Sequence, residues 1–242
     1  MFDNWLYKTS FSLFKKALEE YKLLQDKEKV LIGVSGGADS IVLAHLFNAY
    51  NLRRHKEWNL LAVHIDPGFP QWNTKKIAKF FEEIKIPYLI SKIDVLQKLA
   101  QITKRKQKYC FYCSRERRKR LFEIADQYGI KKIALAHHLE DVNETFLLNL
   151  FYASEITTFV PKQDFFQKRF YIIRPLYFFD KPLISRYLNT YKLPEIKNRC
   201  PYENMSERNR IRKFLNQLYK KDPRIKTNIF WGIKNVKTNY LP

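Results

Sequence analysis

Short apolar stretches alternate with amphipathic ones along the first two-thirds of the chain. Five of these stretches are continuous and rich in Val, Ile and Leu, as is typical of strands buried on both faces. They cover residues 30–34, 60–65, 88–90, 132–136 and 171–173. Helical spacing of apolar positions marks residues 39–50, 74–84, 113–128 and 141–152. Strands that alternate with helices predict an α/β fold with a doubly wound, mainly parallel five-stranded sheet.

Both ends of the chain are predicted to be helical. Phe11, Phe14 and Leu18 recur at helical spacing within residues 1–21. The last part is helical and basic, with helices expected at residues 182–191, 205–219 and 226–236. We therefore expect three parts: an N-terminal helix at 1–27, an α/β domain at 28–178, and a helical C-terminal extension at 179–242.

The charge of the chain is strongly positive. Its 242 residues include 45 Lys and Arg against 24 Asp and Glu, a formal net charge of +21. Genome bias alone can enrich lysine, but an excess of this size predicts attraction to a polyanion, either nucleic acid or an anionic membrane. The sequence has no apolar run long enough to span a bilayer and no signal peptide. These features favour a cytoplasmic protein that does not enter a membrane.

A glycine loop joins the first strand to its helix and reads SGGADS at residues 35–40. Gly36 and Gly37 allow the backbone N–H groups to approach a phosphate closely, and the start of the helix adds its positive end. Ser35 and Ser40 offer hydroxyl donors, whereas Asp39 suits a phosphate only if Mg²⁺ bridges the two charges. The loop matches neither GxxxxGK[ST] nor GxGxxG. A plain Gly-Gly turn, with Asp39 capping the helix, is the alternative.

Three cysteines form a second candidate site. Cys110 and Cys113 make a CxxC at the start of a predicted helix, and Cys200 lies far away in sequence. A CxxC brings two thiolates within reach of one metal centre, or of each other as a redox pair. Three thiolates suit a cubic cluster with one open iron, or a zinc completed by histidine or water. A redox CxxC with Cys200 as a bystander, and three unrelated cysteines, remain open.

Basic residues surround the CxxC. Residues 104–120 contain nine Lys and Arg, interleaved with Tyr109, Phe111 and Tyr112. This pattern predicts binding of a phosphate backbone with stacking of bases, and a solvated helix face is the alternative.

Polar residues follow the second and fourth predicted strands. In a doubly wound sheet, ligands bind at the carboxyl ends of the strands, so Asp66 and His137 are expected beside the nucleotide. His137, Asp141 and Glu144 have spacings that bring their side chains to one helix face. Zinc binding and simple helix capping are alternatives, but we favour Asp141 as an acid/base group or a Mg²⁺ ligand.

Together these segments resemble the tRNA 2-thiocytidine synthetase family of PP-loop enzymes. The similarity covers most of the chain and is carried by SGGADS at 35–40, PGFP at 67–70, CFYCSRERR at 110–118, ALAHHLEDVNET at 134–145, LLNLFY at 147–152, IRPL at 173–176 and the region of Cys200. Many relatives have lysine where Ala38 stands, and a second CxxC where only Cys200 is kept.

The resemblance implies an ATP-dependent tRNA sulfurtransferase with a PP-loop ATP-binding domain at 28–178. ATP and Mg²⁺ would be held by Ser35, Gly36, Gly37, Asp39, Ser40, Asp66 and His137. A [4Fe–4S] cluster on Cys110, Cys113 and Cys200 would keep one iron open to carry sulfur. ATP would adenylate the C2 oxygen of a base, most simply cytidine 32, with Asp141, Arg117 and Arg118 assisting.

The partners implied by the resemblance are tRNA, a sulfur donor (the product of a cysteine desulfurase, or free sulfide) and a second copy of the chain in a homodimer. Thiolation of uridine and a lysidine-type reaction are the nearest alternatives within this fold. A reductase of adenylylated sulfate, with a redox CxxC, and a basic RNA-binding module with a vestigial loop are more distant ones.

Overall fold

The computed structural model describes residues 4–70, 72–97, 109–196, 200, 202 and 206–240. A central sheet is built from β1 (Lys29–Gly33), β2 (Asn59–Asp66), β3 (Tyr88–Lys92), β4 (Lys132–Ala134), β5 (Lys162–Phe165) and β6 (Phe170–Ile173). The helices are α1 (Asn4–Glu20), α2 (Ala38–Arg54), α3 (Thr74–Glu83), α5 (Tyr109–Gln127), α6 (Leu139–Tyr152), α7 (Lys181–Thr190), α8 (Glu207–Lys221) and α9 (Arg224–Gly232), with a 3₁₀ turn, η3, at Thr238–Tyr240.

The strand order is β3-β2-β1-β4-β6-β5, and every pair is parallel except β5 with β6. The predicted doubly wound, mainly parallel sheet is confirmed. The structure adds a sixth strand, β5, at the edge. Its sequence, KQDF, has little apolar character. An edge strand lies at the border of the sheet, so its two faces need not both be buried.

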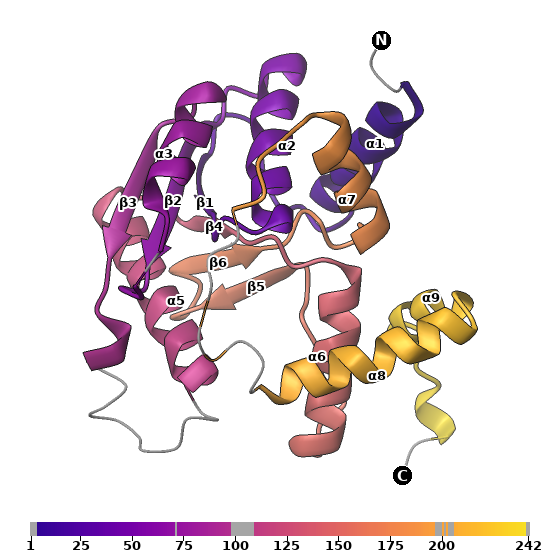
Figure 1. The fold of residues 1–242 in the computed structure, drawn as a ribbon. Helices are drawn as coiled ribbons and strands as arrows, with labels where there is room; N and C mark the ends of the chain where they lie inside the picture. Colours follow the sequence, from indigo (N-terminus) through magenta and orange to yellow (C-terminus); the bar gives the residue numbers. More distant parts are fainter. Residues whose placement is uncertain are drawn as a thin grey trace.

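The two faces of the sheet build two cores, as the twofold alternation of a strand requires. In β1, Val30 and Ile32 pack on one face with residues of α1, α2, α3 and α7, whereas Leu31 faces the other way. Leu31 joins Leu121 and Ile124 of α5 in the second core. Figure 1 shows the resulting layers, with α5 on the side of the sheet opposite α2 and α7.

Helices α6, α8 and α9 pack on one another beside the sheet (Figure 1). Asn143, which is fully buried on α6, donates from Nδ2 to the Tyr219 hydroxyl and to the Lys226 carbonyl, both at 2.9 Å. These bonds fasten α8 and α9 to the helix that follows β4. The division of the chain at 27 and 178 stays a prediction.

The predicted helices are present, with shifted ends. The fourth begins at Tyr109 rather than at residue 113, and the last ends at Gly232 rather than at 236. Residues 1–3 and 205 of the predicted helices and residues 104–108 of the basic stretch lie outside the described residues. Among the helices that the structure describes, none combines the length and hydrophobicity needed to cross a bilayer.

Candidate active site

A cavity of about 500 Å³ opens at the carboxyl ends of β1, β2 and β4. The chain order of the strands reverses between β1 and β4, which is where a doubly wound sheet leaves a crevice for ligands. The volume is ordinary for a site that takes a nucleotide-sized molecule. The lining residues are Gly33, Val34, Ser35, Asp39, Ser40, Val63, Ile65, Ser114, Arg117, Arg118, Leu121, Leu135, Ala136, His137, Asp141, Arg208 and Arg212.

The glycine loop is shaped by the hydroxyl of Ser40. This oxygen accepts from the backbone N–H of Ser35 at 3.1 Å and of Gly36 at 3.2 Å, and it donates to the Gly37 carbonyl at 2.9 Å. The hydroxyls of Ser35 and Ser40 lie 3.2 Å apart. Ser40 thus holds the loop in its turn, while Ser35 is exposed at the mouth of the cavity and α2 begins directly behind it.

Gly36 needs to be glycine in this turn. Its φ is +96°, a left-handed conformation that costs other residues free energy. A Cβ at this position would lie 3.4 Å from the Cβ of Ile196, whose backbone N–H donates to the Gly36 carbonyl at 3.0 Å. The chain just before the Cys200 region therefore packs directly on the loop.

Asp39 and Asp141 lie on either side of His138. The Nε2 atom of His138 is 3.7 Å from Asp39 Oδ1 and 3.4 Å from Asp141 Oδ2, and its Nδ1 atom lies 3.0 Å from Glu140 Oε2. Asp141 also accepts from the His138 backbone N–H at 3.1 Å, as in a capping box. The two carboxylates predicted to bind Mg²⁺ therefore lie on one wall of the cavity. Asp141 caps the start of α6 and also forms part of this wall.

His138 and Glu140 are electrostatically coupled. Burial by itself would lower the pKa of His138, but its hydrogen bond to Glu140 and the nearby carboxylates of Asp141 and Asp39 outweigh burial and raise that pKa. Burial would raise the pKa of Glu140, but His138, the Lys181 backbone N–H and Lys226 lower it to about 2. A protonated His138 therefore reduces the repulsion among three carboxylates.

His137 has a different role from its neighbour. Its Nδ1 atom accepts from Arg174 Nε at 3.2 Å, and its ring lies 4.3 Å from that of Phe159. Burial, with Arg174, Arg208 and Arg118 nearby, lowers the pKa of His137 well below its usual value. His137 is therefore a neutral side chain in the cavity wall and is set apart from the carboxylates by its pairing with Arg174.

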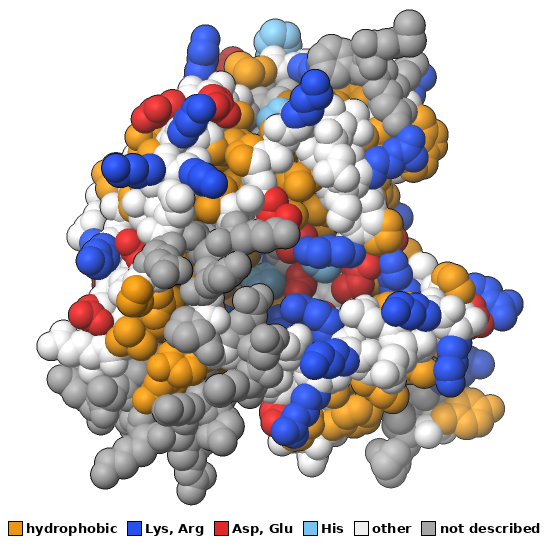
Figure 2. All heavy atoms as spheres, in the orientation of Figure 1, with side chains coloured by type: hydrophobic (Ala, Val, Ile, Leu, Met, Phe, Trp, Pro, Cys, Tyr) orange, Lys and Arg blue, Asp and Glu red, His pale blue; other side chains and the backbone are white. Residues whose placement is uncertain are grey.

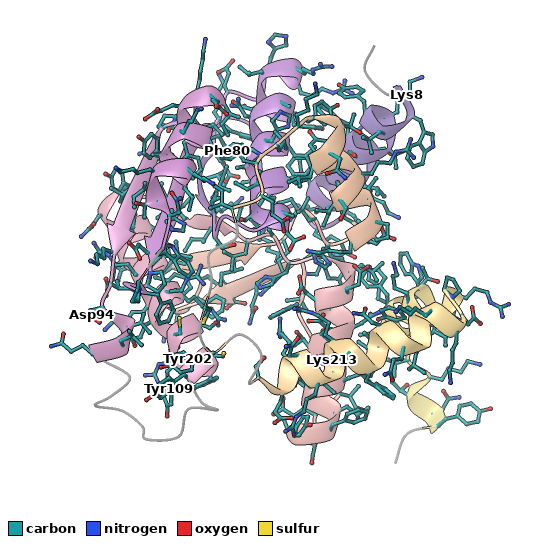
Figure 3. All side chains as sticks on the ribbon, in the orientation of Figure 1. Lys8, Phe80, Asp94, Tyr109, Tyr202 and Lys213 are labelled. Atoms are coloured by element: carbon teal, nitrogen blue, oxygen red, sulfur yellow. The ribbon has the colours of Figure 1, made fainter. Side chains whose placement is uncertain are left out.

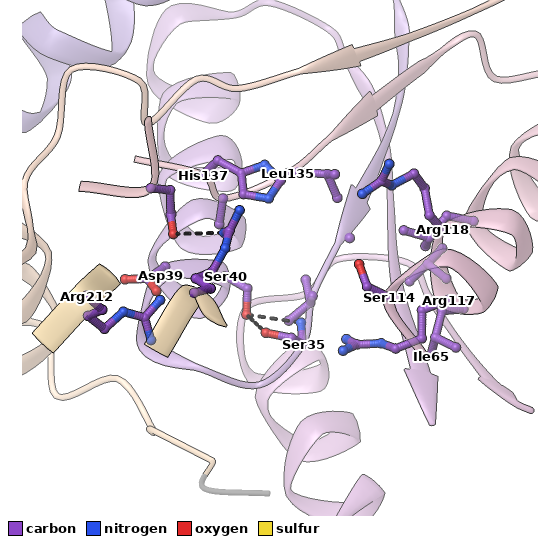
Figure 4. Close-up of a pocket in the computed structure, with 17 residues that line it drawn as sticks. Ser35, Asp39, Ser40, Ile65, Ser114, Arg117, Arg118, Leu135, His137 and Arg212 are labelled. Atoms are coloured by element: carbon purple, nitrogen blue, oxygen red, sulfur yellow. Dashed lines mark hydrogen bonds and ion pairs between the residues drawn. The ribbon is translucent and has the colours of Figure 1, made fainter. Parts of the chain in front are cut away.

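The other wall of the cavity is basic. Figure 4 shows Arg117 and Arg118 reaching into the cavity from α5, opposite Asp39 and Arg212. A site that combines carboxylates with guanidinium groups from two helices suits a polyanion bound together with a divalent cation.

The cysteines lie next to the basic wall. Cys110 Sγ donates to the Tyr202 carbonyl at 3.3 Å, and the rings of Tyr109 and Tyr202 lie 4.8 Å apart (Figure 3). The start of α5 and the Cys200 region are thereby brought together across a long separation in sequence. All three cysteines are half-buried thiols rather than disulfides.

Burial raises the pKa of the Cys113 thiol to about 11, with Arg117 opposing the rise and Cys200 and Cys110 adding to it. The Nε atom of Arg117 is buried and has no hydrogen-bond partner among the described residues. Three neighbouring thiols and a buried cation fit a metal cluster, because a metal replaces the thiol protons and the cation balances the thiolate charge. Among the described residues, no three Cys, His, Asp or Glu side chains converge on one point as they stand.

Two arginines of α8, which we did not predict, complete the cavity. Arg208 lies 3.8 Å from Asp141 and donates to the Thr145 hydroxyl at 2.8 Å, and Arg212 pairs with Glu144. The sequence offered one indication of them. The two arginines are four residues apart, and so on one face, of a helix that buries Ile211 and Leu215. Glu144 pairs with Arg212 and His137 with Arg174, and among the described residues neither forms a metal-binding group with Asp141.

Asp66 lies outside the residues that line the cavity. Its Oδ1 atom accepts from the Gly68 backbone N–H at 2.8 Å and so closes the turn after β2. Beside it, the buried His64 bonds through Nδ1 to the Val34 carbonyl at 2.7 Å and accepts at Nε2 from Trp72 at 2.8 Å. This turn therefore supports the strand that leads into the glycine loop, and the role of Asp66 toward a nucleotide stays a prediction.

Comparison with known proteins gives the family. The model of the PP-loop domain matches residues 7–219. A tRNA-cytidine(32) 2-sulfurtransferase of Coxiella burnetii (strain RSA 493) is 30% identical over 94% of this chain and 89% of its own length. The chain belongs to the PP-loop family of tRNA-cytidine(32) 2-sulfurtransferases. A relative of the same name from Syntrophotalea carbinolica is 28% identical over 99% of this chain and 93% of its own length.

Solved structures agree with this membership of the PP-loop family. The U34-tRNA thiolase NcsA from Methanococcus maripaludis, described with its [4Fe-4S] cluster, superimposes with a TM-score of 0.78 at 25% identity. The match covers 95% of this chain and 78% of that one. An NH3-dependent NAD synthetase from Campylobacter jejuni gives a TM-score of 0.55 at 16% identity over 97% of this chain and 94% of its own, a likeness of fold alone. The resemblance inferred from the sequence motifs is confirmed.

Proposed function

We propose that this protein uses ATP to activate the C2 oxygen of cytidine 32 in tRNA and replaces that oxygen with sulfur. The names of its relatives support this reaction. The observation that carries it is the position of Arg117, which lines the cavity beside the glycine loop and also lies close to Cys113 and Cys200. A nucleotide site and a thiol site therefore share one wall.

The glycine loop is the phosphate-binding end of the cavity. Ser40 keeps the loop in shape, Ser35 offers its exposed hydroxyl, and the start of α2 adds its positive end. Asp39 and Asp141 are the carboxylates that would hold Mg²⁺ against the phosphates. Gly36 and Gly37 allow the backbone to come close to the phosphates. Residues 35–40 therefore act as one phosphate-binding element.

The target base is expected on the side of the cavity where apolar residues and arginines meet. Ile65, Leu121 and Leu135 exclude water there, and Arg118 and Arg208 supply positive charge. In the first step the base oxygen forms a bond to the α-phosphorus as the bond to the β-phosphate breaks and pyrophosphate leaves. Sulfur then adds at C2, and AMP leaves with the oxygen. Asp141 and Arg117 orient and stabilise the adenylated base.

Cys110, Cys113 and Cys200 would hold a [4Fe–4S] cluster. When bound, the cluster supplies an iron without a protein ligand, at which the sulfur for the base can reside. Arg117, which is buried close to Cys113 and Cys200, would balance thiolate charge from within the protein. The sulfur itself would come from free sulfide or the product of a cysteine desulfurase.

The tRNA is expected over the basic surface beside the cavity. Figure 2 shows Lys and Arg side chains around the central hollow and over α8. The net charge of +21 suits a polyanion of this size. A homodimer in the cytoplasm is the assembly and the compartment that we propose.

Thiolation of uridine is the second candidate, because a U34-tRNA thiolase gives the TM-score of 0.78. A decisive experiment uses protein purified without oxygen, with iron and sulfide quantified, and two tRNA transcripts. One transcript keeps cytidine 32 and lacks uridine 34, and the other has the reverse. We expect a cubane cluster that Cys200→Ala destabilises, and thiolation of the first transcript only.

Zinc or no metal in freshly purified protein would contradict the cluster mechanism. Thiolation of the second transcript only would move the reaction to uridine.

A further inference from the structure

Lys181 holds Asp39 at the mouth of the cavity. Its Nζ atom lies 2.6 Å from Oδ1 and 2.8 Å from Oδ2 of Asp39, although the two residues are 142 positions apart in sequence. The Lys181 side chain is 50% exposed. An ion pair this exposed contributes about 0–1 kcal/mol to stability, so folding alone does not account for a lysine placed on both oxygens of a site carboxylate.

The backbone of Lys181 is fixed to the same network as the site carboxylates. Its N–H donates to both oxygens of Glu140, at 3.0 and 3.2 Å, and Glu140 bonds to His138, which stands between Asp39 and Asp141. Lys181 also opens α7, which Asp180 caps by accepting from the Leu183 N–H at 3.0 Å. The Cα atom is therefore held, while the long unbranched side chain reaches Asp39 at the edge of the cavity.

Among the described residues that line the cavity, none is a lysine. The loop SGGADS has no basic side chain. The basic residues that line the cavity are the histidine at 137 and four arginines, two on α5 and two on α8. Asp39 and Asp141 place two carboxylates on the loop side of the cavity. An ammonium group is a compact point charge well suited to phosphate oxygens.

We propose that Lys181 is the residue that binds the departing pyrophosphate, an inference that rests on the proposed function. A divalent cation that arrives with the nucleotide and binds the Asp39 carboxylate repels the Lys181 ammonium, which lies on the same two oxygens. Lys181 therefore leaves Asp39 when the nucleotide binds and moves to oxygens of the β- and γ-phosphates. As the bond between the α-phosphorus and the bridging oxygen breaks, that electron pair stays on pyrophosphate, and Lys181, which keeps its proton, stabilises the new charge.

The first test measures pyrophosphate released in response to tRNA by the cluster-loaded enzyme without oxygen. Lys181→Ala is expected to lower kcat by about 100-fold, as loss of one charge-stabilising donor does in other enzymes, with a smaller change in the KM for ATP. Lys181→Arg retains the charge and should recover part of the rate. Lys192→Ala, an exposed lysine just beyond α7, is the matched control and should equal the wild type.

The second test is independent of turnover. In protein without nucleotide, Lys181 competes with a divalent cation for Asp39, so Lys181→Ala should bind Mn²⁺ about tenfold more tightly by electron paramagnetic resonance, as loss of a competing charge predicts. The same variant should bind inorganic pyrophosphate with Mg²⁺ about tenfold more weakly by calorimetry, because a charge-assisted contact is lost. A purely structural ion pair would leave the affinity for pyrophosphate unchanged, so the calorimetric measurement is the one that decides.

Pyrophosphate affinity that is unchanged in Lys181→Ala would overturn the inference, and so would an unchanged kcat. A wild-type enzyme that releases no pyrophosphate with any tRNA would instead overturn the proposed function. The calorimetric comparison of Lys181→Ala with Lys192→Ala would then still decide whether Lys181 binds pyrophosphate.

Discussion

Arg212 on α8 and Glu144 on α6 form a two-pronged ion pair, with Nε to Oε1 at 2.6 Å and Nη2 to Oε2 at 3.0 Å. The Glu144 side chain is only 4% exposed, whereas that of Arg212 is 48% exposed and also lines the cavity. The pair therefore joins the C-terminal helices to the helix that follows β4, directly at the edge of the candidate active site.

Arg212→Ala is expected to destabilise the protein by about 2 kcal/mol, because it leaves a buried carboxylate without its partner. Urea unfolding of the protein would measure the change. Glu144→Gln in the same background removes the stranded charge and should recover part of the loss. Arg210→Ala is the control, since its side chain is 78% exposed and its loss should cost less than about 0.5 kcal/mol. Equal costs for the two arginines would contradict this account.

Gly36→Ala tests the geometry of the glycine loop. The substitution forces alanine into a left-handed conformation and places its Cβ against Ile196, so the free energy of unfolding should fall by about 1–3 kcal/mol. Gly129→Ala is the control, because Gly129 is also left-handed (φ +61°) but has no atom within 4 Å of the added Cβ. ATP binding by calorimetry should weaken in the first variant only. Normal ATP binding by Gly36→Ala would argue against the loop as the phosphate site.

The lowered pKa of Glu140 predicts how the stability of the fold depends on pH. Its folded pKa of about 2 lies below the ordinary value, so its ionised form stabilises the fold above the unfolded pKa, and this contribution is lost as the pH falls toward 2. The buried carboxylate contributes on the order of 3 kcal/mol at neutral pH. We expect Glu140→Gln to be less stable than the wild type at pH 7 and to lose less stability on acidification to pH 3.

Thermal unfolding between pH 7 and pH 3 would measure this difference. Glu83→Gln, whose carboxylate is 56% exposed, is the matched control and should follow the wild type across the range. Parallel pH curves for Glu140→Gln and the wild type would mean that the Glu140 network does not carry the acid sensitivity.

The fold could be predicted to a large extent because its strands are buried on both faces. Continuous apolar runs such as residues 30–34 reveal parallel strands directly, and the glycine loop marks where the first helix begins. The edge strand β5 escaped this reasoning, since KQDF carries no apolar run. Helix ends shifted by up to four residues, because caps depend on tertiary contacts as well as on local sequence.

The candidate site was harder to predict, because its walls come from elements far apart in the chain. Local motifs indicated Asp39, Asp141 and the cysteines, and the structure places both aspartates beside one cavity. Nothing in the local sequence indicates that Lys181 reaches Asp39 or that Arg212 reaches Glu144. Such long-range pairs follow from the packing of α7 and α8, which periodicity does not specify.

The exposed face of α8 is the last feature with a testable consequence. The exposed residues of α8 include Arg210, Lys213, Phe214 and Lys220. Their spacings of three, four and six to seven residues place them on one side of the helix. The same helix brings Arg208 to the cavity. A basic stripe with an exposed aromatic ring suits a nucleic-acid backbone with an unstacked base. We therefore expect the tRNA to cross α8 on its way to the cavity.

Replacement of Arg210, Lys213 and Lys220 by alanine together is expected to raise the KM for tRNA by about tenfold or more at physiological salt, since each phosphate contact adds to affinity. The slope of log affinity against log salt should fall by about one for each charge removed. The KM for ATP should not change, because none of the three lines the cavity. Lys79→Ala on α3, with a side chain 77% exposed, serves as the control and should bind tRNA as the wild type does. An unchanged salt slope in the triple variant would place the tRNA on another face of the protein.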